Sequence, residues 1–195
     1  FILKGRVNDV GYQSITVPGS LKAYFEAHRD YGRLPWKTIC QPAIQYAEKG
    51  WAVRPHVAYW WSRKEQFGRT PNPQRLRATP ACARLYCDAD GNPLDIGAWV
   101  RNPDLARTLS RIADEGAEVF YTGDIARAID ADMKAHGGLM RYEDLAGYRL
   151  TRTAPMRGTY RGYDIATCPP PGGGIMLVEM LNVLENFDLA ALGHN

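Results

Sequence analysis

Hydrophobic residues recur at three- and four-residue steps along much of this chain, which is the spacing of one face of an α-helix. Such stripes appear after Ser20, around Ile44, after Pro55, after Asn102 and after Gly123. The most apolar stripe begins at Ile175 and continues through Met176, Met180, Leu181, Val183, Leu184 and Phe187. The pattern therefore predicts a mostly helical segment whose last long helix is buried.

Residues that favour helix ends lie at both ends of these stripes. Ser20 is the expected N-cap of the first helix, and Asn102 is the expected N-cap of a later helix with Pro103 at its first position. Pro42 is expected in the first turn of the helix around Ile44, because a proline further inside would remove a backbone hydrogen bond. Glycines are expected to end the helices: Gly32, Gly50, Gly116 and Gly137-Gly138.

Alternation of apolar and polar residues predicts a few strands between these helices. Strand-like segments are expected within residues 1–17, within residues 94–100 and at Tyr163–Thr167. Residues 69–80 and 88–93 are interpreted as loops because prolines, glycines and charges gather there. No internal repeat, linker or domain boundary is apparent, so residues 1–195 are treated as one undivided segment of a longer protein.

Three prolines followed by three glycines form a corner between the predicted strand and the last long helix. Pro169–Pro171 fix the backbone and stop both elements, whereas Gly172–Gly174 accept almost any backbone angle. Glycines before a helix could cradle an anion, because free N–H groups there attract negative charge. The run lacks the spacing of a dinucleotide-binding motif and the Lys-Ser/Thr of a P-loop. Close packing is therefore the preferred interpretation of this corner.

Charge is distributed unevenly along the 195 residues, whose net charge is +3. The segment Arg54–Arg84 holds seven basic residues against Glu65, giving +6 locally and leaving −3 elsewhere. The basic residues are Arg54, Arg63, Lys64, Arg69, Arg75, Arg77 and Arg84, interleaved with Tyr59, Trp60, Trp61 and Phe67. Such a segment could bind nucleic acid or another acidic macromolecule. No nucleic-acid-binding motif accompanies it, so a solvated or interface-facing patch is preferred.

Metal and disulfide patterns are weak. The cysteines at 40, 82, 87 and 168 are scattered, which favours free thiols over a zinc site or a disulfide framework. Asp88, Asp90 and Asn92 have the spacing of calcium ligands, but the closing glutamate of an EF-hand is absent and a turn is predicted. No apolar run reaches the length of a membrane span.

The search for catalytic residues yields no active site. His28, His56, His136 and His194 stand apart from any nucleophile pattern and are interpreted as surface or packing residues. Glu143 and Asp144 suit the first turn of a short helix, where acids favour the helix dipole. Four arginines in the expected extended region could bind a carboxylate, but the exposed face of a sheet is preferred: Arg149, Arg152, Arg157 and Arg161.

A series of short motifs resembles the large subunit of the gamma-glutamyltransferase family in order and spacing. The motifs are Val17-Pro-Gly19, Tyr31-Gly-Arg-Leu-Pro-Trp36, Pro42-Ala-Ile44, Asn102-Pro-Asp-Leu-Ala-x-Thr-Leu109, Phe120-Tyr-Thr-Gly123, Glu143-Asp-Leu-Ala-x-Tyr148, Tyr160-Arg-Gly-Tyr163 and Pro169-Pro-Pro171. One departure is Gly172-Gly173, where members often carry serine or alanine. The departure bears on whether the chain is nearer to transpeptidases or to related acylases and amidohydrolases.

The resemblance implies an α+β fold: a mostly helical segment with a few strands, part of the αββα sandwich of N-terminal-nucleophile hydrolases. It implies a precursor that cleaves itself to free a threonine at the start of a small subunit. That threonine would attack a γ-glutamyl amide, with its own α-amino group as base, and pass the acyl group to water or an amino acceptor. Glutathione is the usual donor, and a periplasmic or extracellular location is typical of the family.

The resemblance places the family's threonine and its carboxylate-binding arginine outside this chain. We therefore assign no catalytic, substrate-binding, cofactor-binding or metal-binding residue here, and no cofactor is implied. The expected partners are the rest of the large subunit, the small subunit and a small γ-glutamyl substrate, without nucleic acid or a membrane span. The alternatives are a related amidohydrolase or acylase, and a non-enzymatic helical module that binds an acidic macromolecule through Arg54–Arg84.

Overall fold

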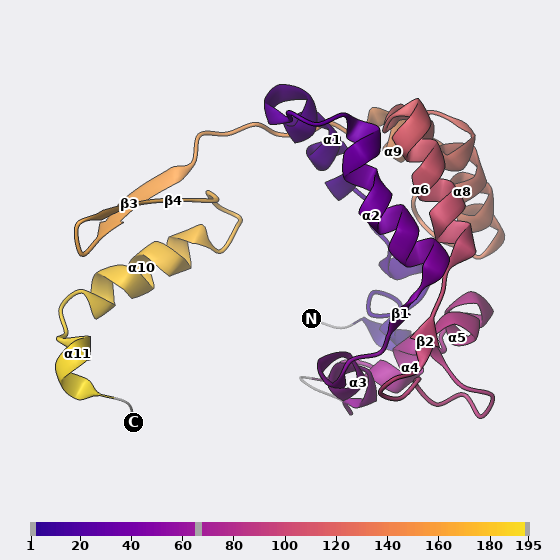
Figure 1. Ribbon diagram of the computed structural model, residues 1–195, viewed down its shortest axis with the longest axis horizontal. Coiled ribbons are helices and arrows are strands. Elements are labelled where there is room, and N and C mark those ends of the chain that lie inside the picture. The colour runs from indigo at the N-terminus through magenta and orange to yellow at the C-terminus, as the bar shows by residue number, and fades with distance from the viewer. Residues whose placement is uncertain (1–2, 65–67, 194–195) are drawn as a thin grey trace. The chain divides into compact units, whose positions relative to one another are not determined.

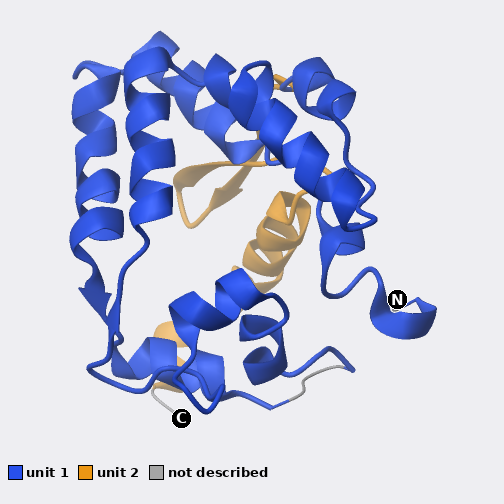
Figure 2. Cartoon of the chain, turned by 90° about the vertical axis from the view of Figure 1, so that its right-hand side faces the viewer, with its two compact units in different colours: residues 1–150 blue, residues 151–195 orange. Residues whose placement is uncertain are grey.

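The structure is a computed structural model that describes residues 3–64 and 68–193. The chain divides into two compact units, residues 1–150 and residues 151–195 (Figure 2). That both units belong to one domain of a longer protein remains a prediction. None of the helices in the described part of the chain has the length and apolar character that a membrane span requires.

The first unit is mainly helical (Figure 1). Its α-helices are α1 (Ser20–Tyr31), α2 (Trp36–Lys49), α3 (Pro55–Ser62), α4 (Asn72–Leu76), α5 (Pro80–Tyr86), α6 (Pro103–Glu115), α7 (Glu118–Tyr121), α8 (Asp124–Ala135) and α9 (Tyr142–Gly147). Two 3₁₀ turns, η1 (Lys4–Arg6) and η2 (Tyr12–Ser14), precede them. The strands β1 (Trp51–Ala52) and β2 (Trp99–Val100) form a short antiparallel pair.

Helices α2 and α6 pack against each other, and the indole Nε1 of Trp36 donates a hydrogen bond to the carbonyl of Ile112 at 3.1 Å. A buried cluster lies between α7, α8 and α9. Its members are Ala117, Tyr121, Ala126, Met133, Met140 and Leu145. These residues come from the most regular part of the sequence, where α6 and α8 form as expected and Gly116 ends α6 as predicted.

Tyr121 ties this cluster to the start of α1. Its side chain is completely buried, and its hydroxyl donates to the carbonyl of Pro18 at 2.5 Å. The same hydroxyl accepts the backbone N–H of Lys22 at 3.0 Å. That N–H lies in the first helical turn and has no partner within the helix. Tyr121 therefore caps α1, whose N-cap is Gly19 and not the expected Ser20.

Two predictions for the helices of this unit are confirmed, and a third is wrong. Asn102 caps α6 as expected, since its side chain accepts the N–H of Leu105 at 3.0 Å. Gly50 ends α2 as expected, with a φ of 89°. Pro42 was expected in the first turn of α2, but α2 begins at Trp36 and contains Pro42 in its interior. The packing of α2 on α6 outweighs the hydrogen bond that this proline removes.

Two segments differ from their predicted structure. The strand expected within residues 1–17 is wrong for residues 3–17, because η1 and η2 form there and Gly5 and Gly11 have positive φ; residues 1 and 2 lie outside the described residues. The loop expected at residues 69–80 contains α4 and the start of α5. Its prolines lie in the first turns of these helices, where the missing N–H has no helical partner to lose.

The second unit is a β-hairpin covered by a helix. Strands β3 (Met156–Tyr160) and β4 (Tyr163–Thr167) pair antiparallel, and the predicted strand at Tyr163–Thr167 is confirmed. The turn residues Arg161 and Gly162 both have positive φ, as a two-residue hairpin turn requires. Helix α10 (Gly174–Leu184) follows, and then α11 (Leu189–Leu192).

The proline and glycine corner packs tightly onto the end of β4. A Cβ atom on Gly174 would lie 2.1 Å from the carbonyl oxygen of Cys168, and one on Gly172 would lie 2.8 Å from its sulfur. Gly173 has no atom within 4 Å of its Cβ position. Two of the three glycines are therefore required by close approach, which agrees with the packing interpretation.

Helix α10 was predicted to be buried, and in this structure it is not. Its Val178 packs against Gly158 on β3, and Val178 and Leu181 are half-buried. Most of its other apolar side chains are exposed: Ile175, Met176, Leu177, Met180, Val183 and Leu184. The hairpin covers one side of a helix whose residues are apolar except for Glu179 and Asn182.

Candidate functional site

Four of the seven basic residues of the segment Arg54–Arg84 surround one hollow in the first unit. The hollow has a volume of about 380 Å³ and is lined by Trp60, Arg63, Lys64, Arg69, Thr70, Asn72 and Arg75. We refer to these seven residues as the basic hollow. Among the described lining residues four are cationic and none is acidic, so the hollow is suited to a negatively charged ligand.

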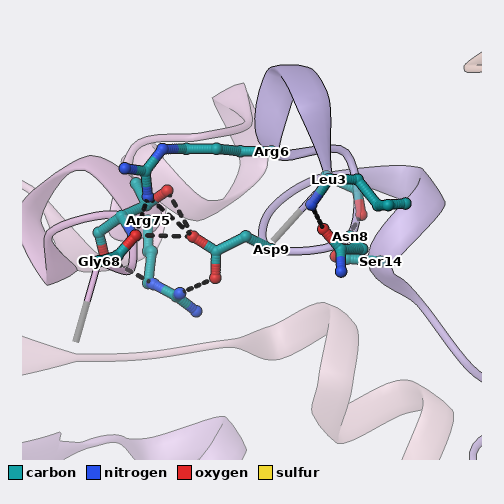
Figure 3. A network of polar contacts seen from close by, with 9 residues as sticks. Leu3, Arg6, Asn8, Asp9, Ser14, Gly68 and Arg75 are labelled. Atoms are coloured by element: carbon teal, nitrogen blue, oxygen red, sulfur yellow. Dashed lines mark hydrogen bonds and ion pairs between the residues drawn. The ribbon is translucent and has the colours of Figure 1, made fainter. Parts of the chain in front are cut away.

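A polar network fixes one wall of the basic hollow (Figure 3). The carboxylate of Asp9, whose side chain is 7% exposed, forms an ion pair with Arg75 and accepts the backbone N–H and the hydroxyl of Thr70, each at 2.7 Å. Arg6 also lies 3.7 Å from this carboxylate and donates to the carbonyl of Gly68. The two hydrogen bonds from Thr70, with the charge of Arg75, lower the pKa of Asp9 from 3.8 to about 2. The network is therefore charged at neutral pH.

The opposite wall holds Arg63 against two aromatic rings. The guanidinium carbon of Arg63 lies 4.8 Å from the ring centre of Trp60 and 5.3 Å from that of Tyr59. Such cation–π contacts orient the guanidinium without using its N–H groups. The amide of Asn72 donates to the carbonyl of Trp60 at 2.7 Å and so connects this wall to α4.

The rest of the basic segment does not contribute to this hollow. Arg54, Arg77 and Arg84 are absent from its lining, and Arg77 lies within 3.4 Å of the carbonyl of Gly91. Glu65 and Phe67 lie outside the described residues. Asp9 was not identified from sequence, because it stands 66 positions from Arg75 and no local motif joins them.

The histidines that the structure describes contact neighbouring rings and backbone carbonyls, and His136 also lies 3.2 Å from the carboxylate of Asp132. The ring of His28 contacts the carbonyl of Leu34 at 2.7 Å, and His56 packs edge-on to Trp60. His136 stacks on Tyr12 with ring centres 4.5 Å apart. None of these three contacts a nucleophile among the described residues, and His194 lies outside them.

The acidic pairs and turns are also structural. Asp144 accepts the N–H of Arg141 at 2.8 Å, which stabilises the first turn of α9 as expected for the Glu143-Asp144 pair. The carboxylate of Asp88 accepts the N–H groups of Asp90 and Asn92, so the expected turn is confirmed.

In the described part of the chain, arginines of the extended region contact backbone carbonyls or are exposed, and the thiols form no disulfide. Arg149 donates to the carbonyls of Ala146 and Tyr148, Arg157 is exposed on β3, and Arg161 donates to the carbonyl of Phe187. The four cysteines are free, and burial raises the pKa of the Cys40 and Cys87 thiols. Across residues 3–64 and 68–193, no group of three or more His, Cys, Asp or Glu residues could hold a metal ion.

Similarity to known proteins decides the family. The family model described as Gamma-glutamyltranspeptidase matches residues 3–195. The chain belongs to this family. It is 39% identical over 191 residues to the Acylase ACY 1 proenzyme of Pseudomonas sp. (strain V22), covering 97% of this chain and 33% of the relative. It is 35% identical over 179 residues to the Glutathione hydrolase proenzyme of Escherichia coli (strain K12), covering 90% of this chain and 29% of the relative.

The fold of this family member agrees with solved structures. The gamma-glutamyltranspeptidase of Helicobacter pylori matches with a TM-score of 0.84 at 31% identity, over 100% of this chain and 55% of that one. The cephalosporin acylase of Bacillus halodurans matches with a TM-score of 0.74 at 33% identity, over 93% of this chain and 33% of that one. The mixed helical and strand fold is thus that of N-terminal-nucleophile hydrolases, and the family consists of enzymes. The chain spans about a third of the length of the curated relatives it matches.

Proposed function

We propose that this chain is part of a gamma-glutamyltransferase-like enzyme that cleaves γ-glutamyl amides of the glutathione type. Family membership over residues 3–195 supports this reaction class. In the proposed reaction, the hydroxyl of a threonine freed by self-cleavage attacks the amide carbonyl, and the threonine's α-amino group takes the proton. The amine leaves with that proton and an acyl ester remains. Water or an amino acceptor then takes the γ-glutamyl group and restores the threonine.

Within this enzyme we assign the chain a structural role, with the threonine and the substrate contacts supplied by residues elsewhere in the protein. The observation that carries this role is the exposed apolar surface of α10, where Met176, Met180, Val183 and Leu184 line a hollow of about 450 Å³. Apart from Glu179 and Asn182, the residues of α10 are apolar, and a helix of this composition is typical of the core of a larger protein. The rest of the large subunit and the small subunit are the proposed cover of this surface.

An activity assay tests the structural role. The purified 195-residue chain should not hydrolyse a chromogenic γ-glutamyl anilide, whereas the self-cleaved full-length protein should. N-terminal sequencing of the small subunit should find threonine as its first residue. Hydrolysis by the 195-residue chain alone would contradict the assignment of the catalytic residues to other parts of the protein.

A related acylase or amidohydrolase is the second candidate within the same class. The observation that favours it is the 39% identity to an acylase proenzyme, against 35% to the Escherichia coli glutathione hydrolase proenzyme. Comparing a γ-glutamyl anilide with a glutaryl anilide, which lacks only the α-amino group, separates the two. Preference for the γ-glutamyl compound supports a γ-glutamyltransferase, and preference for the glutaryl compound supports an acylase.

The non-enzymatic module has less support than either enzyme. Its proposed docking surface would need the whole segment Arg54–Arg84, but three of the seven basic residues lie away from the basic hollow. Membership in a family of enzymes also favours an enzyme over a non-enzymatic module.

A further inference from the structure

The basic hollow carries positive charge that the described residues do not balance. The side chains of Lys64 and Arg69 are exposed and form no hydrogen bond or ion pair with any described residue. Arg63 has only its two aromatic contacts. Arg75 shares the single carboxylate of Asp9 with Arg6. Even with Glu65 counted, the sequence from 54 to 84 has a charge of +6.

The two walls of the hollow are held in place without the charged groups of Lys64 and Arg69. On one wall, Arg75 donates from its Nε to the carbonyl of Thr70 at 2.9 Å, and Asp9 fixes the other end of its guanidinium. On the other wall, the backbone N–H of Asn72 donates to the carbonyl of Arg63 at 3.2 Å. Anchored walls lower the ordering cost when a ligand binds.

The donors that remain free suit a planar or tetrahedral anion. The guanidinium of Arg63 lies over Trp60 and Tyr59, which leaves its N–H groups unpaired among the described residues. Arginine presents these groups as a rigid fork that matches phosphate and carboxylate oxygens. Arg69 offers a second fork, and Lys64 adds a point charge.

The amount of charge distinguishes between these anions. A carboxylate carries one negative charge, whereas a phosphate group carries about 1.5 to 2 at neutral pH. Three cations that have no acidic partner among the described residues therefore match a ligand with more than one phosphate. The volume of about 380 Å³ also falls in the range of small-molecule sites, above what one small anion fills.

We propose that the basic hollow binds a compact diphosphate group, with Arg63, Lys64 and Arg69 as its ligands and the Asp9–Arg75 pair as its fixed wall. The diphosphate could be free pyrophosphate or the end of a nucleotide, since the two present the same anion. This inference does not rest on the proposed γ-glutamyl chemistry.

Calorimetric titration of the full-length protein with pyrophosphate at low ionic strength tests the proposal. We expect saturable binding that weakens as salt is added. The double variant Lys64→Gln/Arg69→Gln should weaken it at least about tenfold, because each lost charge-assisted hydrogen bond accounts for roughly that factor. Titration with ADP identifies the source of the group: tighter binding than pyrophosphate indicates a nucleotide, and equal binding indicates the free anion.

The double variant Arg54→Gln/Arg84→Gln is the matched control. It removes the same charge from the same basic segment at two exposed positions that do not line the hollow. Binding in this control should stay within about twofold of the parent protein. An equal loss in both double variants would show that only surface charge attracts the anion, and would overturn the proposal. Absence of saturable binding by the parent protein would overturn it as well.

Discussion

At the scale of single residues, the structure depends on polar groups that join distant parts of the chain. Asp9 is the clearest example, because one carboxylate contacts Arg6, Thr70 and Arg75. Its side chain is 7% exposed. A buried carboxylate that accepts three hydrogen bonds, two from Thr70 and one from Arg75, favours its ionised form in the folded state.

The free energy of unfolding should depend on pH through the ionisation of Asp9. The pKa of Asp9 is lowered from 3.8 to about 2 on folding, so its contribution is present above pH 4 and is lost as the pH falls to about 2. Asp9→Asn should therefore be less stable than the parent protein at neutral pH, and the difference should shrink between about pH 4 and pH 2. Urea denaturation at several pH values measures the free energy of unfolding.

The control for this measurement is Asp90→Asn. The Asp90 side chain makes no hydrogen bond or ion pair with the described residues, so its removal should leave both stability and pH dependence unchanged. A constant difference between Asp9→Asn and the parent protein from pH 7 to pH 2 would contradict the ionised network.

At the scale of elements, the junction between α2 and β1 depends on a glycine. Gly50 has a φ of 89°, and a Cβ atom there would lie 2.4 Å from the indole nitrogen of Trp99 and 2.6 Å from the carbonyl of Val100. The indole in turn donates to the carbonyl of Lys49 at 2.8 Å. The C-terminal end of α2 therefore packs directly on the β1–β2 pair. A side chain at position 50 would push the two apart.

Substituting Gly50→Ala should destabilise the protein by about 2 kcal/mol or more, from backbone strain together with the steric conflict. Gly91→Ala is the matched control, because Gly91 has a φ of 78° but no atom within 4 Å of its Cβ position. Gly91→Ala should lower the free energy of unfolding only through backbone strain, by about 1 kcal/mol. Thermal denaturation of both variants compares the two costs. Equal costs would show that contact with Trp99 and Val100 is unimportant.

The sequence predicts those features of this protein that neighbouring residues determine. It does not predict the features that tertiary contacts determine. Asn102 and Gly50 end their helices as predicted, because caps depend on neighbouring residues. The interior position of Pro42 follows from packing on α6, which no local pattern shows. In the candidate site, the basic segment was visible from its composition. Which four of its residues meet, and their link to Asp9, depends on the fold.

At the scale of the whole molecule, the second unit exposes most of the apolar side chains of α10. Met176 and Met180 on α10 are 57% and 52% exposed. An apolar surface of this kind marks an interface or promotes aggregation. Under the proposed function, the same surface is covered in the full-length enzyme.

The double variant Met176→Glu/Met180→Glu should therefore have opposite effects in two contexts. In the 195-residue chain it should reduce self-association, seen by sedimentation velocity, because two charges replace apolar side chains. In the full-length protein it should lower stability by several kcal/mol, because it buries charges without partners. Unchanged stability of the full-length protein would argue that α10 remains exposed there.

The bonds of Tyr121 also have a consequence for synthesis on the ribosome. Its hydroxyl contacts Pro18, which lies 103 residues earlier in the chain. At a translation rate of roughly 5–20 residues per second, about 5–20 seconds pass between the appearance of these two residues. During that interval α1 lacks the group that caps its first turn, and Leu21 and Phe25 lack the core on which they pack. We therefore expect α1 to become stably packed only after α7 has been synthesised.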